Sequence, residues 1–486
     1  MRRTLLLLLV LAAAGGWLIA GAGPDVRRTH VTSAGVPLDV VHPAGNGPHP
    51  GVVVAHGFSG SAKLMAPFGD TLAARGYVVV LLDFSGHGAN TRSLPDQAAG
   101  TADSTRALQR DLDAAVAHLR SLPGADPARI ALVGHSMGAG AVTRYAAAHR
   151  DVTATVAISL PDASAATADG PARLLTVVGA LEFPGFHEAA TSAAAQRDDR
   201  ASYTVAGVEH ITVLYAPETH RETVAWLDRA FGGSRDDDAI PFPGRRLVGA
   251  ALLVLAFLLG FHPLTVLLAG PAAGPRPPFG LRAMGAVPAV LGLAAAGAIT
   301  AVAAVVARFL PTDDLPLAIG GYVAGYAAVI GVLLLAYARR LPKDPTRRAG
   351  RLRLLAVVPY AIVSVAVPVH LGLTHAVPSG DRWWLLLIVW AAFALFAYGA
   401  ERATRGVPLH LLVIAAFFVV VLAAAAITGL THGFVLLVLF PLIGLLLWQT
   451  LWSATLNRFA VPAWIIAVTG SIVVAWPLAV ALPLAG

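Results

Sequence analysis

The pattern of apolar and polar positions divides the chain near residue 240. Before this point, short apolar runs alternate with stretches in which charged and turn residues recur every few positions. Beyond it, charged residues are confined to short clusters between long uncharged runs, which is the pattern of membrane-spanning helices. We therefore predict a globular domain at residues 25–234, a linker at 235–246 and a transmembrane domain at 247–486.

Fully apolar runs in the first half indicate buried strands, and stretches with helical spacing separate them. The predicted strands are residues 37–42, 51–55, 77–82, 130–133, 153–159, 174–178 and 202–205. The predicted helices are residues 63–75, 104–122, 139–149, 187–197 and 217–231. Apolar strands that alternate with helices imply an α/β fold with a mostly parallel sheet covered on both faces.

One motif lies where a predicted strand meets a predicted helix: Gly134-His135-Ser136-Met137-Gly138. This is G-x-S-x-G, in which glycines two residues to either side of the serine leave room for a sharp turn. Such a turn lifts the hydroxyl of Ser136 clear of the sheet edge. Ser136 is therefore the predicted nucleophile. His135 and His87 have no carboxylate or second histidine at ligand spacing, so no metal site is predicted.

These motifs, in this order, resemble the α/β-hydrolase family over residues 25–231. The resemblance rests on His56-Gly57-Phe58 after an early strand, Ser85-Gly86-His87-Gly88 after the next, the Ser136 turn, Gly179-Ala180-Leu181-Glu182 after a late strand, and His210 before the last helix. The family order of nucleophile, acid and histidine is kept. The resemblance implies a serine hydrolase of the esterase or lipase type that uses no cofactor.

A serine hydroxyl attacks when an imidazole takes its proton and a carboxylate orients that imidazole. His210 is the predicted base because it lies at the carboxyl edge of the sheet, where ligands collect. His187 and His220 are the alternatives, and His220, inside the last predicted helix, is expected on the surface. Glu182 stands where the family places its acid, and Asp162, after the preceding strand, is the alternative acid.

An oxyanion also forms during acyl transfer and needs donors that are fixed in advance. By resemblance, these are the backbone N–H groups of Phe58 and Met137. Families of this type often insert a cap between the strands that end near 159 and start near 174, but residues 161–173 are too few for one. We expect an open site that accepts a bulky acyl substrate or is covered by something else, for which the membrane is the obvious candidate.

The second half is predicted to form about eight transmembrane helices in addition to one amino-terminal span. The predicted spans are residues 247–270, 283–307, 315–338, 354–377, 383–400, two helices within 406–457 separated near Thr431, and 461–484. None of these spans contains an acidic or basic residue other than histidine, so no ion path through the bilayer is predicted. Residues 1–24, with Arg2 and Arg3 before an uncharged run, are a signal anchor or a signal peptide.

Composition refines this picture in two ways. The net charge of +7 comes mostly from basic residues in loops between apolar runs, which indicates membrane topology rather than nucleic-acid binding. The basic segments near Arg276, at 339–353, near Arg402 and at Arg458 are expected in the cytoplasm and the hydrolase domain outside it. The chain has no cysteine, so no thiolate nucleophile is available.

The sequence thus predicts a multi-pass cell-membrane protein whose extracytoplasmic serine hydrolase cleaves an ester, thioester or amide through an acyl-enzyme. Its expected partners are the lipid bilayer and an acyl-ester or lipid-like substrate, with no nucleic acid; the oligomeric state is left open. The alternative is a non-catalytic membrane scaffold, or a lipid- or solute-handling protein, whose hydrolase-like domain binds rather than cleaves.

Overall fold

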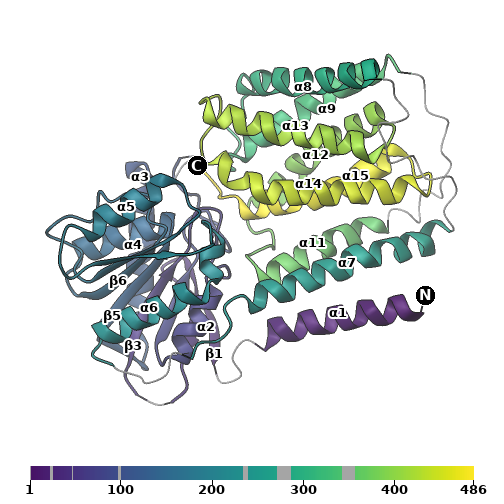
Figure 1. Cartoon of the computed structure of the whole chain (residues 1–486). Helices are drawn as coiled ribbons and strands as arrows, with labels where there is room; N and C mark the ends of the chain where they lie inside the picture. The colour runs from purple at the N-terminus through teal and green to yellow at the C-terminus, as the bar shows by residue number, and fades with distance from the viewer. Residues whose placement is uncertain are drawn as a thin grey trace. The chain divides into compact units, whose positions relative to one another are not determined.

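The computed structural model describes residues 2–21, 26–45, 47–96, 100–233, 239–270, 286–312, 314–341 and 356–486. The chain forms two compact units (Figure 1). The sheet unit comprises Ala12–Leu253, Pro368–Val377 and Pro483–Gly486, and the helical unit comprises Met1–Leu11, Val254–Val367 and Pro378–Leu482. The aspartates of the predicted linker at 236–238, the loop that contains Arg276 and most of the basic segment at 339–353 lie outside the described residues.

The sheet unit is built on an eight-stranded sheet with the order β1-β2-β4-β3-β5-β6-β7-β8. Its strands are β1 Arg27–Ser33, β2 Val36–His42, β3 His49–Ala55, β4 Val78–Leu82, β5 Ala125–His135, β6 Val152–Ile158, β7 Leu174–Gly179 and β8 Ala201–Val205. From β4 to β8 every neighbouring pair is parallel. Only the pairings that involve β2 are antiparallel. The prediction of an α/β fold with a mostly parallel sheet is confirmed.

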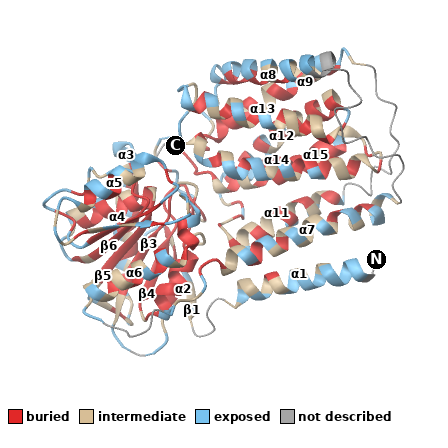
Figure 2. Ribbon diagram, viewed as in Figure 1, coloured by how far each residue is buried: buried red, intermediate tan, exposed pale blue. Residues whose placement is uncertain are grey.

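Helices cover both faces of this sheet because alternate strand residues point to opposite sides. Val52 and Val54 of β3 join one apolar cluster, which includes residues of α2 (Ala66–Ala74) and α6 (Pro217–Ala230). Val53 and Ala55 join the cluster on the other face, with α3 (Ala102–Ser121) and α4 (Met137–Ala148). Helix α5 (Pro184–Ala194) packs with the start of α4 in a smaller cluster. Figure 2 shows the buried strands between these helices.

Strand β1 is the element of the sheet that sequence analysis did not predict. It contains mostly polar residues and is half-exposed along its length, so it lacks the apolar run that marked the other strands. Its pairing comes from the turn, in which Ala34 and Gly35 both have positive φ, 48° and 79°. Two such residues favour a tight hairpin, which sets β1 antiparallel to β2.

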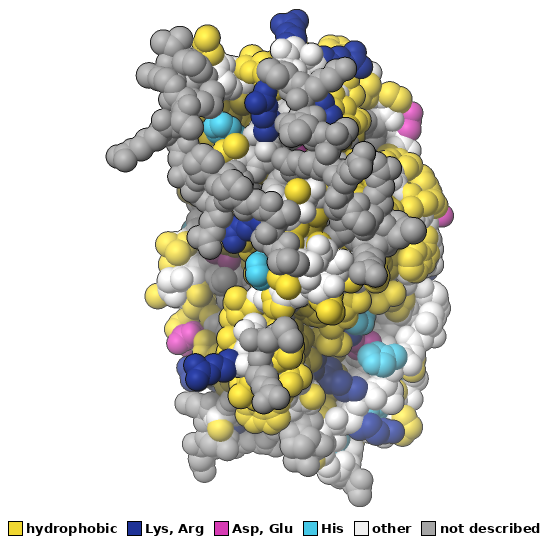
Figure 3. All heavy atoms as spheres, turned by 90° about the vertical axis from the view of Figure 1, so that its right-hand side faces the viewer, with side chains coloured by type: hydrophobic (Ala, Val, Ile, Leu, Met, Phe, Trp, Pro, Cys, Tyr) yellow, Lys and Arg dark blue, Asp and Glu magenta, His cyan; other side chains and the backbone are white. Residues whose placement is uncertain are grey.

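The remaining helices are long and apolar. They are α1 Arg2–Ala20, α7 Arg245–Ala269, α8 Ala286–Arg308, α9 Gly320–Ala338, α11 Val357–Gly372, α12 Arg382–Thr404, α13 Pro408–Ile427, α14 Val435–Asn457 and α15 Ala463–Ala481. Within the described residues, eight of them are long and apolar enough to cross a bilayer, and α11 is shorter, at 16 residues. Large apolar side chains such as Leu267, Ile427 and Phe440 are exposed on them, and apolar side chains form several patches on the face in Figure 3. These features are compatible with a membrane protein.

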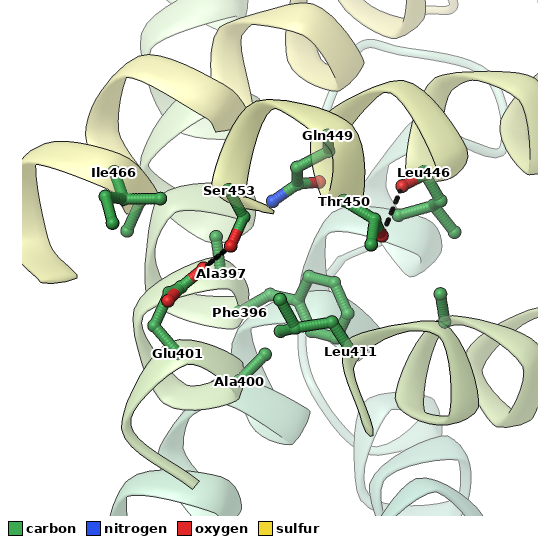
Figure 4. A pocket seen from close by; sticks show the side chains of 12 residues that line it. Phe396, Ala397, Ala400, Glu401, Leu411, Leu446, Gln449, Thr450, Ser453 and Ile466 are labelled. Carbon is green, nitrogen blue, oxygen red and sulfur yellow. Dashed lines mark hydrogen bonds between the residues drawn. The ribbon is translucent and has the colours of Figure 1, made fainter. Parts of the chain in front are cut away.

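Helix α12 extends beyond the uncharged span predicted at 383–400. It continues to Thr404, so Glu401 lies inside the helix and is buried. Ser453 of α14 donates to one carboxylate oxygen of Glu401, and Asn457 Nδ2 donates to the other at 3.1 Å. Figure 4 shows Glu401 and Ser453 at a small cavity that Gln449 and Thr450 also line. Polar groups therefore join α12 to α14 inside the helical unit.

Candidate active site

Ser136 occupies the turn between β5 and α4. Its backbone angles, φ 53° and ψ −118°, are strained for a residue with a side chain. The two glycines of the motif allow the turn to close. A Cβ at Gly134 would lie 2.3 Å from the carbonyl oxygen of Gly138, and one at Gly138 would lie 2.5 Å from that of His56. The local sequence thus forces a tight strand-to-helix turn with serine at its tip.

His210 and Glu182 lie next to Ser136, although they come from separate loops of the sheet edge. Glu182 follows the end of β7, and His210 lies between β8 and the short 3-10 helix η1 (Thr212–Tyr215). His210 Nε2 is 3.0 Å from Ser136 Oγ, and His210 Nδ1 is 2.8 Å from Glu182 Oε2. Because the carboxylate accepts from Nδ1–H, Nε2 is left to accept the serine hydroxyl proton.

The second oxygen of Glu182 is also held. Glu182 Oε1 accepts from the backbone N–H of Gly179 at 2.8 Å and from the hydroxyl of Ser159 at 2.8 Å. The Glu182 side chain has no solvent exposure, and that of His210 is 14% exposed. The carboxylate is therefore fixed in direction before any substrate arrives. Ser159, at the end of β6, was not identified in the sequence, since a lone serine after a strand carries no motif.

Asp162, the alternative acid, is placed differently. It lies on the exposed loop after β6, where its Oδ1 accepts from the backbone N–H of the nearby Ser164 at 2.9 Å. The structure therefore brings Glu182, and not Asp162, to His210.

Of the three candidate histidines, His210 is the one that the structure bonds to Ser136. His187 is half-buried on α5. His220 is fully buried, so the prediction of a surface histidine is wrong. Its ring stacks on Phe68 with centroids 4.1 Å apart, its Nδ1 lies 2.9 Å from the hydroxyl of Thr71, and its Nε2–H donates to Leu214 O at 2.9 Å. Burial lowers the pKa of His220 to about 4. The residue is a neutral core histidine that joins α6 to α2.

His135, the residue before Ser136, supports the histidine loop. Its Nε2–H donates to the backbone carbonyl of His210 at 2.8 Å, and the two rings are 4.8 Å apart. Burial, and then the positive potential of His210, hold the pKa of His135 well below its ordinary value. A neutral His135 keeps this donor role at physiological pH. On another side, the ring of Phe186 lies 4.7 Å from that of His210.

The candidate oxyanion donors are Met137, which directly follows the serine, and Phe58, which follows a glycine packed on the serine turn. Met137 is the first residue of α4, so its N–H has no partner within that helix and points out of the positive helix end. Phe58 follows Gly57, which packs on the turn: a Cβ at Gly57 would lie 3.0 Å from Ser136 Cβ. The arrangement can stabilise charge beside the serine hydroxyl, and the assignment of the two donors stays a prediction.

Three large apolar side chains are exposed beside the candidate acid and base. Leu181 and Phe183, on either side of Glu182, are 67% and 70% exposed, and Ile211, next to His210, is 44% exposed. Exposed apolar groups gathered around a polar reactive centre can accept an apolar part of a ligand.

Comparisons with known proteins relate the first half of the chain to hydrolases. Residues 46–193 match the family model described as serine aminopeptidase, S33. The match contains Ser136 and Glu182 and ends before His210. Cutinase 1 of Thermobifida cellulosilytica is 28% identical over 120 residues, which are 25% of this chain and 43% of that protein. A cutinase of Thermobifida fusca is also 28% identical over 120 residues, which are 37% of its length. The chain thus spans less than half of the cutinases it matches.

Solved structures with a similar course of the chain include a dienelactone hydrolase of Anabaena variabilis, 17% identical, with a TM-score of 0.34 over 43% of this chain and 98% of that chain. Another is a predicted CIB-like hydrolase of Thermoplasma acidophilum, 19% identical, with a TM-score of 0.36 over 43% of this chain and 100% of that chain. The family match and the sheet together define the first half of the chain as an α/β-hydrolase-type domain, similar in sequence to serine aminopeptidases and cutinases.

Proposed function

We propose that this protein is a membrane-embedded serine hydrolase that cleaves an ester, thioester or amide through an acyl-enzyme. One observation carries the proposal: a serine at a strained strand-to-helix turn, a histidine 3.0 Å from its hydroxyl, and a buried carboxylate 2.8 Å from the other ring nitrogen. A carboxylate kept only for structure has no need to face a histidine that faces a serine.

The proposed reaction proceeds in two steps. His210 Nε2 takes the proton of Ser136 while Ser136 Oγ bonds to the carbonyl carbon of the substrate, and the N–H groups of Met137 and Phe58 receive the oxyanion. Glu182 stabilises the imidazolium, which then protonates the leaving group as its bond to the carbonyl carbon breaks. In the second step water attacks the acyl-enzyme, His210 takes its proton and returns it to Ser136, and the acid is released.

The proposed substrate carries an apolar acyl chain. Leu181, Phe183 and Ile211 are exposed on the loops that hold Glu182 and His210, and the loop after β6 is too short to cover them as a cap domain would. Burial of an acyl chain against such side chains contributes about 0.8 kcal/mol per CH₂. A lipid or another acylated molecule of the membrane fits this surface, because the same chain carries long apolar helices.

The test uses an active-site-directed fluorophosphonate probe on the purified full chain. We expect the wild type to be labelled and the Ser136→Ala variant to lose labelling and ester hydrolysis while it keeps its melting temperature, since only the covalent step needs the hydroxyl. Ser164→Ala, at an exposed loop serine, is the matched control and should retain both activities. Equal labelling of wild type and Ser136→Ala would reject Ser136 as the nucleophile. A wild type that neither labels nor cleaves acyl esters would favour a binding function.

A further inference from the structure

Two segments from the second half of the chain are part of the sheet unit. Pro368–Val377 begins within α11 and continues past the end of that helix, and Pro483–Gly486 follows α15. Each of them makes hydrogen bonds to a loop that leaves the carboxyl end of a central strand, β3 in the first case and β4 in the second. These two strands lie next to each other in the sheet.

The first segment is attached to the loop after β3 at Ser61. Thr374 Oγ1 lies 2.8 Å from Ser61 Oγ, and the backbone N–H of His375 donates to the same Ser61 Oγ at 3.1 Å. Both hydroxyl residues are buried, with 1% exposure for Ser61 and 8% for Thr374. Ser61 is three residues after Phe58. The loop that carries this candidate oxyanion donor is therefore anchored from outside the β/α part of the chain.

The second segment lies against the loop after β4 through an isolated parallel bridge between Ala485 and Leu94. Leu484 N–H donates to Gly86 O and Leu94 N–H donates to Leu484 O, both at 2.8 Å. Gly486 N–H donates to Leu94 O and Asp96 N–H donates to Gly486 O, both at 3.1 Å. Gly86 has a φ of 79°, and a Cβ there would lie 2.4 Å from Leu484 O, so the close approach needs glycine. The buried side chains of Leu484 and Leu94 complete this contact.

The two loops are joined to each other by Asp83. Asp83 Oδ1 accepts from the N–H of Ala62 at 2.7 Å, and Oδ2 accepts from the N–H of Ala89 at 2.8 Å. Burial raises the pKa of Asp83, and the hydrogen bonds from Ala62 and Ala89 oppose that rise. The carboxylate thus links the loop after β3, next to Ser61, to the loop after β4.

His56 makes a second link between these loops. It donates through Nδ1–H to Gly57 O at 2.8 Å and accepts from Phe84 N–H through Nε2 at 3.1 Å. Burial lowers its pKa to about 4, so it stays neutral and keeps both roles. The rings of His87 and Phe58 are 5.8 Å apart. Residues 56–62 and 83–94 consequently form one hydrogen-bonded block that touches the Ser136 turn through Gly57.

We propose that Thr374 and the segment Pro483–Gly486 are positioning elements of the hydrolase, which hold this block so that the N–H of Phe58 faces the oxyanion. The proposal rests on the proposed function, since a positioned donor matters only if Ser136 reacts. It also gives the second half of the chain a role in the chemistry besides anchoring. On this account the stretch 25–234 alone lacks two of the contacts that fix its oxyanion loop.

The kinetic test compares variants of the full chain in detergent on a short, soluble p-nitrophenyl ester. Thr374→Val keeps the shape and removes the hydroxyl, and we expect kcat to fall about tenfold with KM within about twofold, because a displaced donor loses part of the 10²–10³-fold contribution of an oxyanion donor. Thr374→Ser should restore kcat. Thr428→Val is the matched control: its hydroxyl bonds to Ala424 O in its own helix, and we expect no change. Deletion of Pro483–Gly486 removes the backbone hydrogen bonds to Gly86, Leu94 and Asp96, and it should act as Thr374→Val does.

A second measurement does not depend on catalysis. Hydrogen–deuterium exchange of a peptide that covers residues 56–64 should be faster in Thr374→Val than in the wild type, while a peptide from β6 should be unchanged. Unchanged exchange at 56–64 overturns the proposal, as does an unchanged kcat in an active enzyme. If the wild type has no activity that depends on Ser136, the proposed function fails while the exchange still decides whether the two segments hold the loop.

Discussion

The role proposed for Glu182 in catalysis can be tested with a substitution that keeps the size of its buried side chain. Both of its oxygens are engaged, one by His210 and one by Gly179 and Ser159. Glu182→Gln keeps the size of the side chain but replaces an acceptor by an amide donor, so His210 is pushed toward the wrong tautomer. We expect kcat for ester hydrolysis to fall by about 10³–10⁴-fold, as it does when a triad acid becomes its amide. KM should change little, which steady-state kinetics on a soluble ester would show.

Asp162→Asn is the control for this substitution, because Asp162 lies on an exposed loop and is bonded to Ser164. Its kcat should stay within about twofold of the wild type. A large loss in Asp162→Asn together with an active Glu182→Gln would move the acid to the loop after β6.

Because His220 is buried, we expect the stability of the fold to decrease at acidic pH. Burial lowers its pKa in the folded chain from 6.5 to about 4. Between these values the unfolded chain binds a proton at this residue and the folded chain does not, so the free energy of unfolding falls as the pH decreases. The slope from one such group is at most about 1.4 kcal/mol per pH unit. Melting temperatures should therefore drop between pH 6.5 and 4, and less steeply in His220→Gln. Parallel curves for the two proteins would contradict this origin.

At the residue scale, the sequence predicted the groups that belong to motifs and missed those that only support them. Ser136, Glu182 and His210 could be found because strand ends and family order locate them. Ser159, which holds Glu182, and His220, which is buried between two helices, depend on which elements become neighbours in space. A single sequence does not contain that information at those positions.

The turn between β5 and α4 allows a matched test at the scale of an element. Gly138→Ala places a Cβ within 2.6 Å of the carbonyl oxygens of both Ala55 and His56, whereas Gly140→Ala, in the same helix, meets only Pro161 at an ordinary 3.6 Å. We expect Gly138→Ala to lower stability by about 1–3 kcal/mol and to reduce activity, because the backbone must shift. Gly140→Ala should raise stability by about 0.5–1 kcal/mol. Thermal unfolding of both variants checks the prediction, and equal effects would refute it.

Elements with a strong apolar pattern were predictable, and those set by pairing or packing were not. The central strands β3 to β7 are apolar runs, but β1 is polar and forms because a tight turn places it beside β2. Helix α12 continues past residue 400 because Glu401 is buried against hydroxyl and amide groups of α14. The uncharged run at 383–400 is therefore shorter than the helix.

At the scale of the whole molecule, we propose one membrane topology, argued from the helix order and from the contacts of the sheet unit. If α1 carries the sheet domain out of the cytoplasm and each later helix crosses once, the chain is outside again after α11 and after α15. These are the two places where segments join the sheet unit, at Pro368–Val377 and Pro483–Gly486. A count in which the 16-residue α11 did not cross would put Thr374 on the side opposite to Ser61, to which it is bonded. The basic ends at Arg340, Arg405 and Arg458 then face the cytoplasm, as expected for positive loops.

The absence of cysteine from the sequence makes this topology directly testable. Single-cysteine variants at exposed positions can be treated in intact cells with a membrane-impermeant maleimide. The variants are Asp169→Cys in the sheet unit, His432→Cys between α13 and α14, and Arg340→Cys after α9. We expect the first two to be labelled and Arg340→Cys to react only after the membrane is opened. Labelling of Arg340→Cys from outside would reverse the orientation. Labelling of Asp169→Cys without His432→Cys would instead mean that one helix between them does not cross. Because Thr374 is bonded to Ser61 on the side of the sheet unit, that helix would be α12 or α13, which lie between Thr374 and His432.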